Sequence, residues 1–408
     1  MTNENASLAG LRVIDLTNEY GVYCGKLMAG MGAEVIKVEK PGGDPTRHIG
    51  PFYGDNPHPE KSLFFAYHNT GKKSITLNLE SRDGQEIFKK LVETADVILE
   101  TSPADYMPGL GLGADVLREI KPDLVMTSIT PFGRSGPYRD YKASSEIVPL
   151  AMGGLMYMTG ETGERPVQVG YYLVGHAVGI YAAVGTLAAV HSSRLTGEGE
   201  HVDISIQECV ASWLEASYIL YQYSNKQITC RNGNQHPFLT PGRLFPCKDG
   251  YCNIGAPGRW NEVVVWLLEN DIDVGDLIET KYVAPGGDNL LFNERPRINQ
   301  LICQLTLKYT KKELMLEGQK RGIPITAMED AASVYGEDQH LEVRGYFVVE
   351  EHPVMGKLKY PGAPFKMTES PWQMGGPAPL VGQHNEEIYG GLGISRDELA
   401  VLLGAGII

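Results

Sequence analysis

The sequence predicts an α/β protein with a large domain built on a parallel sheet and a second, smaller α/β domain. Two observations support this fold class. Strand-like and helix-like segments alternate through the first 130 residues, as they do when helical crossovers join parallel strands. The chain of 408 residues is also longer than one hydrophobic core usually serves.

The alternation can be followed element by element. Short runs of apolar and β-branched residues predict strands at 11–16, 33–41, 74–79, 97–100, 124–129 and 201–205. Amphipathic or continuously apolar segments predict helices up to residue 32 and at 81–95, 114–120, 174–195 and 206–223. The first strand–helix–strand unit suits a right-handed crossover between parallel strands. The whole pattern is typical of a doubly wound, Rossmann-like domain.

Changes in composition predict the domain boundaries. Residues 1–225 are expected to form the N-terminal part of the large domain, and the polar, turn-rich segment 226–246 is expected to be a linker. A smaller α/β domain follows at 247–340. The remaining segment, 341–408, begins with the alternating, proline-interrupted pattern of a small antiparallel sheet and contains a helix from about 395 to 403.

Charge and cysteine content exclude several classes of partner. The net charge of −14 argues against nucleic acid, because binding a phosphate backbone requires a basic face. A small anionic ligand needs only a few cations and remains compatible. The six cysteines show neither a CxxC pair nor zinc spacing with histidine. Without a signal peptide, or an apolar run of about 18 residues that could span a membrane, we expect a cytoplasmic protein with no membrane partner.

Five segments spread over the chain carry a family resemblance. They are LAGLRVIDLT with MGAEVIKVEKPGGDPTR, HNTGKKSITLNL, FGRSGPYRDYKASSEIVPLAMGGLMYMTGE, VGYYLVGHAVGIYAAVGTLAAVHSSRLTGEGEHVDISIQE and PGAPFKM. In this order they resemble the class III CoA-transferases, the family of formyl-CoA transferase and carnitine CoA-transferase. The resemblance implies an interlocked-ring dimer in which residues 341–408 return to the large domain. It also implies coenzyme A thioesters as substrates and no covalently bound cofactor.

The catalytic position of the family is altered in this sequence. The resemblance implies covalent catalysis by an aspartate, which attacks the acyl-CoA thioester and passes through a mixed anhydride and an aspartyl-CoA thioester. The aspartate's place, between Gly170 and Gly179, is occupied by Gly175. No acidic residue lies between positions 164 and 198. His176 is a candidate substitute, although a partly buried histidine at a helix start is the more ordinary interpretation.

The family's CoA contacts are matched unevenly. Lys40 and Lys142 fall where the family places basic residues for the nucleotide and phosphates, although either could be an ordinary solvated lysine. Thr101 and Ser102 replace an Asn-Phe pair, and Gly109 replaces an arginine. We therefore assign Lys40, Lys142, Thr101 and Gly109 as the candidate CoA-binding positions, no residue as a metal ligand, and no certain nucleophile.

Three functions remain open. The leading hypothesis is a non-catalytic subunit of a heteromeric CoA-transferase, whose homologous partner carries the aspartate. The two-subunit type that moves CoA from succinyl-CoA to (R)-benzylsuccinate in anaerobic toluene breakdown fits best. The second is a self-sufficient CoA-transferase or a racemase-like enzyme with a substitute residue, although the histidine of the racemases is absent from residues 143–146. The third is an acyl-CoA-binding or regulatory protein without turnover.

Overall fold

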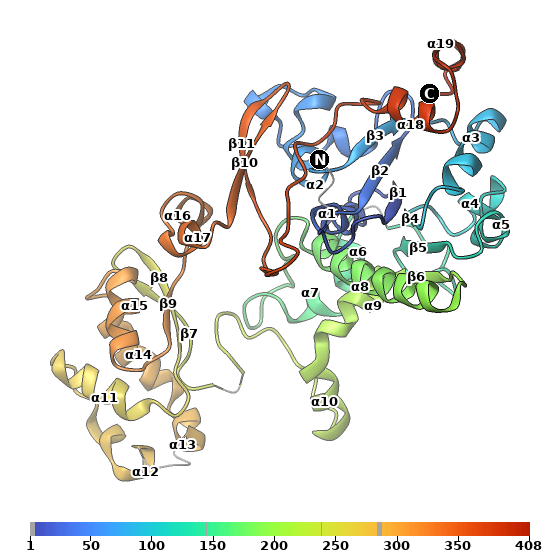
Figure 1. The fold of residues 1–408 in the computed structure, drawn as a ribbon. Coiled ribbons are helices and arrows are strands. Elements are labelled where there is room, and N and C mark those ends of the chain that lie inside the picture. Colours follow the sequence, from blue (N-terminus) through green and yellow to red (C-terminus); the bar gives the residue numbers. More distant parts are fainter. Residues whose placement is uncertain (1–4, 144, 238, 284–287) are drawn as a thin grey trace. The chain divides into compact units, whose positions relative to one another are not determined.

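The computed structural model describes residues 5–143, 145–237, 239–283 and 288–408 (Figure 1). The chain divides into two compact units. The first consists of residues 1–156, 168–227 and 340–408, and the second of residues 157–167 and 228–339.

The first unit is built on a six-stranded parallel sheet in the order β3-β2-β1-β4-β5-β6. The direction in which strands are added reverses between β1 and β4, which is the hallmark of a doubly wound sheet. The predicted fold class is thus confirmed. The strands are β1 (Arg12–Leu16), β2 (Glu34–Glu39), β3 (Lys73–Thr76), β4 (Val97–Glu100), β5 (Val125–Thr130) and β6 (His201–Ser205).

Both faces of this sheet are covered, so its central strands are almost entirely buried. Alternate residues of a strand point to opposite faces. Val13 of β1 and Leu99 of β4 accordingly join one buried cluster with helices α1 and α8, whereas Ile14 and Ile98 join another with α3 and α5. This double burial explains why apolar residues predominate on both faces of these strands, although the buried charges of Asp15, Lys37 and Glu100 interrupt them.

The helices predicted up to residue 32 and at 81–95, 114–120, 174–195 and about 395–403 are present, the other short helices of the first unit were not predicted, and one prediction needs correction. The segment 206–223, expected to be a single helix, is broken into α9 (Ile206–Ala211), a 3-10 turn and α10 (Glu215–Tyr223). The other helices are α1 (Val22–Gly30), α2 (Leu63–His68), α3 (Arg82–Val92), α4 (Tyr106–Gly109), α5 (Ala114–Ile120), α6 (Ile147–Met152), α7 (Leu155–Met158), α8 (Leu173–Thr196), α17 (Gln339–Val343), α18 (Asn385–Gly391) and α19 (Arg396–Gly404), with 3-10 turns η1 (Pro45–His48), η2 (Tyr53–Asp55), η3 (Pro59–Lys61) and η4 (Ser212–Leu214).

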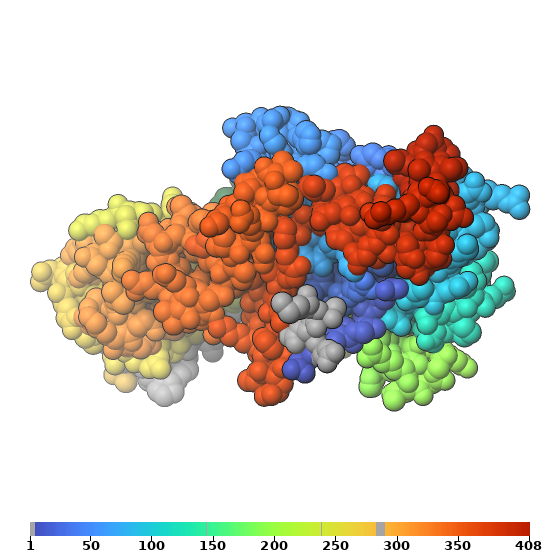
Figure 2. Space-filling model, turned by 45° about the horizontal axis from the view of Figure 1, so that its top comes forward, coloured from blue at the N-terminus to red at the C-terminus, as the bar shows by residue number. Residues whose placement is uncertain are grey.

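The C-terminal segment is tied to the edge strand β3. Strands β10 (Phe347–His352) and β11 (Gly356–Pro361) pair antiparallel, as the pattern near residue 350 predicted. The backbone N–H of His384 donates to the carbonyl oxygen of Ser74, and the Asn385 amide donates to Thr76 Oγ1 at 2.8 Å. Figure 2 shows the red C-terminal residues lying against the blue N-terminal ones. Residues at opposite ends of the sequence therefore complete one unit.

The second unit is a small three-stranded antiparallel sheet with helices. Its strands are β7 (Gly242–Cys247), β8 (Gly250–Gly255) and β9 (Ile325–Ala327), in the order β7-β8-β9. Strand β7 begins inside the segment expected to be a linker. The helices are α11 (Trp260–Glu269), α12 (Thr280–Val283), α13 (Asp288–Asn293), α14 (Arg295–Thr306), α15 (Lys311–Lys320) and α16 (Ala331–Gly336), with a 3-10 turn η5 (Gly275–Ile278).

One expectation about apolar stretches was wrong. Helix α8 is, by length and composition, long and apolar enough to cross a membrane, contrary to the expectation that no segment is. Half of its apolar window is buried inside the structure, and its buried side includes Val174, Val178 and Ala182 in the cluster with the sheet. A buried core helix of a globular protein passes the same test of length and composition.

Candidate functional site

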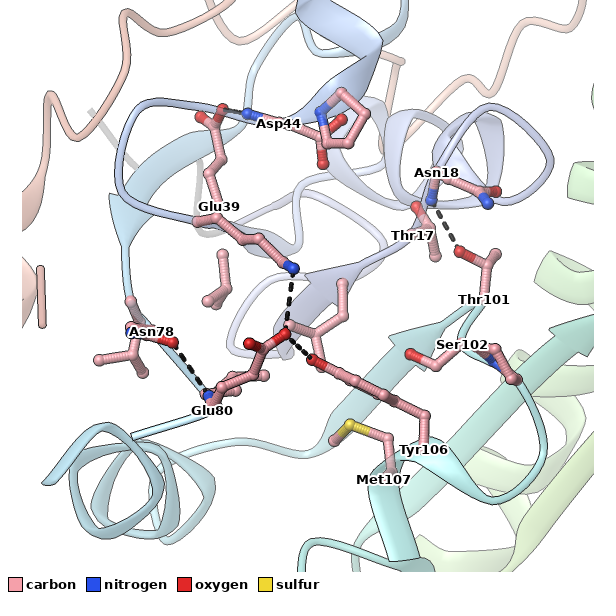
Figure 3. Close-up of a pocket in the computed structure, with 17 residues that line it drawn as sticks. Thr17, Asn18, Glu39, Asp44, Asn78, Glu80, Thr101, Ser102, Tyr106 and Met107 are labelled. Atoms are coloured by element: carbon pink, nitrogen blue, oxygen red, sulfur yellow. Dashed lines mark hydrogen bonds and ion pairs between the residues drawn. The ribbon is translucent and has the colours of Figure 1, made fainter. Parts of the chain in front are cut away.

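A cavity of about 360 Å³ lies at the carboxyl ends of strands β1 to β4. Ligands of doubly wound sheets bind at this edge, where the strand order reverses and neighbouring loops separate. The volume falls within the usual range of small-molecule sites. Figure 3 shows the lining side chains, which come from four segments, 16–18, 38–45, 77–80 and 101–107.

The acidic residues on one side of this cavity are neutralised by buried cations. Lys37 Nζ lies 3.1 Å from Asp44 Oδ2 and 3.7 Å from Asp15 Oδ1, and the Arg47 guanidinium donates to both oxygens of Glu39 at 2.6 and 2.7 Å. Burial disfavours the charged form of Asp15, but two buried lysines outweigh this effect and lower its pKa to about 2. Charged groups so deeply buried persist only when they are paired. They therefore form a fixed structural wall.

The opposite side of the cavity carries a more exposed cluster. Lys40 Nζ lies 3.2 Å from Glu80 Oε1, and the Tyr106 hydroxyl donates to the same oxygen at 3.3 Å. In Figure 3 the Tyr106 hydroxyl points to the Glu80 carboxylate. Burial, and then the nearby Glu80 charge, raises the pKa of Tyr106. Among the described residues that line the cavity, Lys40 is the only lysine or arginine, and it faces a carboxylate.

Two of the predicted CoA-binding residues line this cavity and two do not. Lys40 and Thr101 line it together with Ser102. Thr101 Oγ1 accepts a hydrogen bond of 2.8 Å from the Asn18 backbone N–H, so the loop after β4 is fastened to the loop after β1. The structure therefore brings Lys40 and Thr101 to one site, while their contact with CoA stays a prediction.

Gly109 and Lys142 lie elsewhere. Gly109 is the last residue of α4, and a methyl group added to it would meet no atom within 4 Å. Lys142 is an exposed residue of the loop after β5. Neither is among the residues that line the cavity. Their roles toward CoA are likewise predictions.

The position that the family resemblance assigns to the nucleophile lies at the start of α8. Gly175 is buried in the first turn of this helix, and its backbone N–H donates to Glu146 Oε1 at 3.0 Å. A Cβ atom added at this position would lie 2.8 Å from the backbone carbonyl oxygen of Glu19. Real Cβ atoms do not approach backbone so closely, so a side chain here requires the chain around Glu19 to move.

Glu146 is the carboxylate nearest to Gly175. Its side chain is 7% exposed in relative terms and accepts hydrogen bonds at the N-terminus of α8, where the helix dipole favours negative charge. Burial, together with the neighbouring charge of Glu19, raises its pKa despite hydrogen bonds from the Gly175 and Val174 backbone. A carboxyl group whose pKa is perturbed by burial is a candidate functional group.

His176 belongs to a cluster of aromatic rings beside the same helix turn. Its Nδ1 lies 2.8 Å from the Tyr172 carbonyl oxygen, so the neutral ring carries its proton on Nδ1. The ring centroid lies 4.4 Å from that of Tyr23 and 5.1 Å from that of His68. Burial lowers the pKa of His68 well below its usual value. His176 is thus held by its backbone contact and packed among rings, as a structural histidine at a helix start would be.

The sequence did not predict two residues of these sites. Glu80 directly follows the predicted strand 74–79, and a charged residue at a strand's carboxyl end is a signal that could have indicated it. Glu146 has no such signal, because it meets Gly175 across 29 residues of sequence. Only folding brings that pair together.

Comparison with known proteins decides the family. A profile of CoA-transferase family III matches residues 8–385. The chain belongs to this family. The expected family resemblance is therefore confirmed, and CoA thioesters are the substrates of the family's transferases. Among the described residues, no group of three or more His, Cys, Asp or Glu side chains could hold a metal ion.

Relatives match over nearly the whole chain. Subunit BbsE of succinyl-CoA:(R)-benzylsuccinate CoA-transferase from Thauera aromatica is 32% identical over 97% of both chains. A succinyl-CoA:mesaconate CoA-transferase from Haloarcula marismortui is 34% identical, over 95% of this chain and 97% of its own. A crystal structure of a CAIB/BAIF family protein from Brucella suis has a TM-score of 0.83 and 27% identity, covering 95% of this chain and 100% of that chain.

Proposed function

We propose that this chain is the non-catalytic subunit of a heteromeric, cytoplasmic CoA-transferase. The complex would move CoA from an acyl-CoA donor, for which we propose succinyl-CoA, to a carboxylic acid such as (R)-benzylsuccinate. A homologous partner subunit would carry the aspartate and interlock with this chain, as the family resemblance implies. The 32% identity to BbsE, which is named as a subunit of such an enzyme, supports this choice.

One observation carries the proposal. The position expected to hold the nucleophile is a buried glycine, and a Cβ atom added to it would lie only 2.8 Å from the Glu19 carbonyl oxygen. A nucleophilic carboxylate needs open space on the side from which the thioester approaches. Here that space is taken by the loop after β1. The packing around Gly175 therefore supports a chain that has no nucleophile of its own at this position.

The decisive experiment compares this chain alone with a mixture that contains an aspartate-bearing family member. We expect CoA transfer from succinyl-CoA only in the mixture. Gly175→Asp should leave this chain alone inactive, and Gly170→Asp serves as a control for an added charge in the same segment. Full CoA transfer by the chain alone would overturn the proposal. Binding of acyl-CoA with no contribution to turnover in any mixture would instead indicate a regulatory protein.

A second candidate function is a self-sufficient transferase that uses a substitute carboxylate. The observation that favours it is the buried Glu146, whose pKa is raised and which lies beside Gly175. The Glu146 carboxylate would attack the thioester carbonyl, the C–S bond would break, and a glutamyl mixed anhydride would form with release of the CoA thiolate. Incubation of the chain with succinyl-CoA, followed by hydroxylamine and mass spectrometry, would detect it. An adduct on Glu146 that disappears in Glu146→Gln would favour this candidate over the non-catalytic subunit.

A further inference from the structure

We propose that a groove between helices α3 and α19 docks another protein, through an amphipathic segment whose apolar face is flanked by lysine or arginine. The two helices, which are labelled in Figure 1, both belong to the first unit. The α3–α19 groove has a volume of about 470 Å³ and shares no lining residue with the cavity at the strand ends. Docking there involves neither CoA nor Gly175, so it goes beyond the proposed function.

The floor of the α3–α19 groove is apolar. Ile87 of α3 is 7% exposed and belongs to a buried cluster of the first unit, and Ile394 and Leu402 pack against the same cluster. Val401 of α19 also lines the groove, and it is 70% exposed. The core thus holds the floor in place while the groove stays open to water. Small-molecule sites enclose most of their ligand, so an open apolar groove better suits a protein partner that covers it.

The remaining lining residues of the groove are charged. They are the acids Asp83, Glu86, Asp397 and Glu398 and the single lysine Lys90. Four negative charges and one positive charge leave a net charge of −3 around the apolar floor. Complementary charges guide association and exclude wrong partners. The groove is therefore complementary to apolar side chains flanked by lysine or arginine, and it repels an acidic segment.

The chain itself neutralises only part of this negative charge. Glu86 pairs with Lys89 of its own helix at 2.9 Å. In the part of the chain that the structure describes, no side chain forms an ion pair with Asp83 or Asp397. Both lie in the first turn of a helix, where the helix dipole stabilises an acid. The dipole accounts for these two carboxylates, but it does not account for the apolar floor between them.

The adjoining surface hollow between α18 and α19 is built differently. It shares Ile394 with the α3–α19 groove and contains two acids of its own, Glu386 and Glu387. Both are paired within the chain, Glu387 with Lys73 at 2.6 Å and Glu386 with Arg396. Cations of a partner would have to displace these pairs. In the groove, by contrast, the two aspartates are available to a partner.

One wall of the groove lies outside the part of the chain that the family profile matches. The match to CoA-transferase family III ends at residue 385, whereas α19 begins at Arg396. This position suits a partner particular to this chain and its near relatives, and not a step of the chemistry that the whole family shares.

Fluorescence anisotropy with the full-length chain tests the proposal. The probes are two labelled amphipathic helical peptides of about 18 residues, one of leucine and lysine and one of leucine and glutamate. We expect the wild type to bind the lysine peptide at least about tenfold more tightly, and added salt to weaken this binding. Asp83→Asn combined with Asp397→Asn should weaken it by about fivefold through lost charge. Val401→Ser should weaken it by about fivefold through lost apolar contact.

Each variant has a matched control. Glu119→Gln combined with Glu369→Gln changes the net charge by the same amount as the aspartate pair, and both glutamates are exposed outside the groove. Leu403→Ser matches Val401→Ser, because Leu403 is 65% exposed on the same helix and does not line the groove. The controls should leave the affinity for the lysine peptide unchanged. Circular dichroism would verify that all variants are folded.

Three outcomes would overturn the proposal. The first is equal affinity of the wild type for the two peptides, and the second is an equal loss of affinity in the groove variants and in their controls. The third is a change of oligomeric state in Val401→Ser, measured by sedimentation, which would mean that a second copy of the chain covers the groove. Since neither CoA transfer nor an aspartate-bearing subunit enters these measurements, their failure is distinct from failure of the subunit proposal.

Discussion

Two regions of the first unit adjoin the loop after β1 and are built in opposite ways. At the start of α8 the chain is closely packed, with Gly175 against the Glu19 carbonyl oxygen and the Glu146 carboxylate buried beside it. At the strand-end cavity the side chains line an open space, and Glu80 lies in contact with water. Packing determines what fits in the first region, and charge determines it in the second. A single side chain can reverse a charge, whereas it cannot reopen a packed site.

The largest effect on the free energy of unfolding is expected in the wall of the cavity, where charged side chains are buried. Lys37→Met removes the cation between Asp15 and Asp44 and leaves both carboxylates buried without it. Removal of one partner from a buried ion pair costs about 3–5 kcal/mol. Urea unfolding should show this loss. Lys40→Met, at the exposed pair, should change the free energy of unfolding by less than about 1 kcal/mol. Similar losses in the two variants would mean that the cavity wall is not held by its buried charges.

An intermediate effect is expected from Gly175→Ala. Alanine favours a helix interior, but its Cβ would lie 2.8 Å from the Glu19 carbonyl oxygen, so the free energy of unfolding should fall by about 1–3 kcal/mol. Gly170→Ala is the control, because a Cβ there meets nothing within 4 Å, and its effect should stay within about 0.5 kcal/mol. Thermal and urea unfolding would measure both. A neutral Gly175→Ala would show that the start of α8 is open after all.

The smallest effect is expected from Glu146→Gln. The amide oxygen can still accept from the Gly175 N–H, so the loss should stay below about 1 kcal/mol, whereas Glu146→Ala leaves that donor unpaired and should cost about 1–3 kcal/mol. Because burial raises the pKa of Glu146 in the folded state, protonation favours folding. The contribution of the protonated Glu146 carboxyl to stability is complete below the pKa that Glu146 has in the unfolded chain. This contribution is lost as the pH rises through the pKa that Glu146 has in the folded protein.

Glu146→Gln is permanently neutral and escapes that loss. Its stability relative to the wild type should therefore rise with pH above about 4.3, the ordinary glutamate pKa, and then level off. A stability difference that does not change with pH would show that Glu146 titrates normally and that the start of α8 is more open to water than the contact with Gly175 indicates.

The sequence predicted the architecture well where a pattern was local. The boundaries of β4, α5 and β6 agree with the predicted ranges, because turn residues delimit each of these short segments in the sequence. The segment 206–223 was mistaken for one helix, since helical periodicity continues through a 3-10 turn. The family resemblance, and not local pattern, indicated Lys40 and Thr101 as CoA-binding positions, and both line the cavity because they follow strands of one parallel sheet.

The sequence by itself therefore determined the sheet order's general type, the family and the absence of a carboxylate at position 175. Only the tertiary structure decided which groups surround Gly175. The Glu19 carbonyl and the Glu146 carboxylate reach Gly175 from segments far apart in the sequence, and Lys40 meets Glu80 across two strands. Contacts of this kind depend on packing and on charge in three dimensions, which the local periodicity of a chain does not encode.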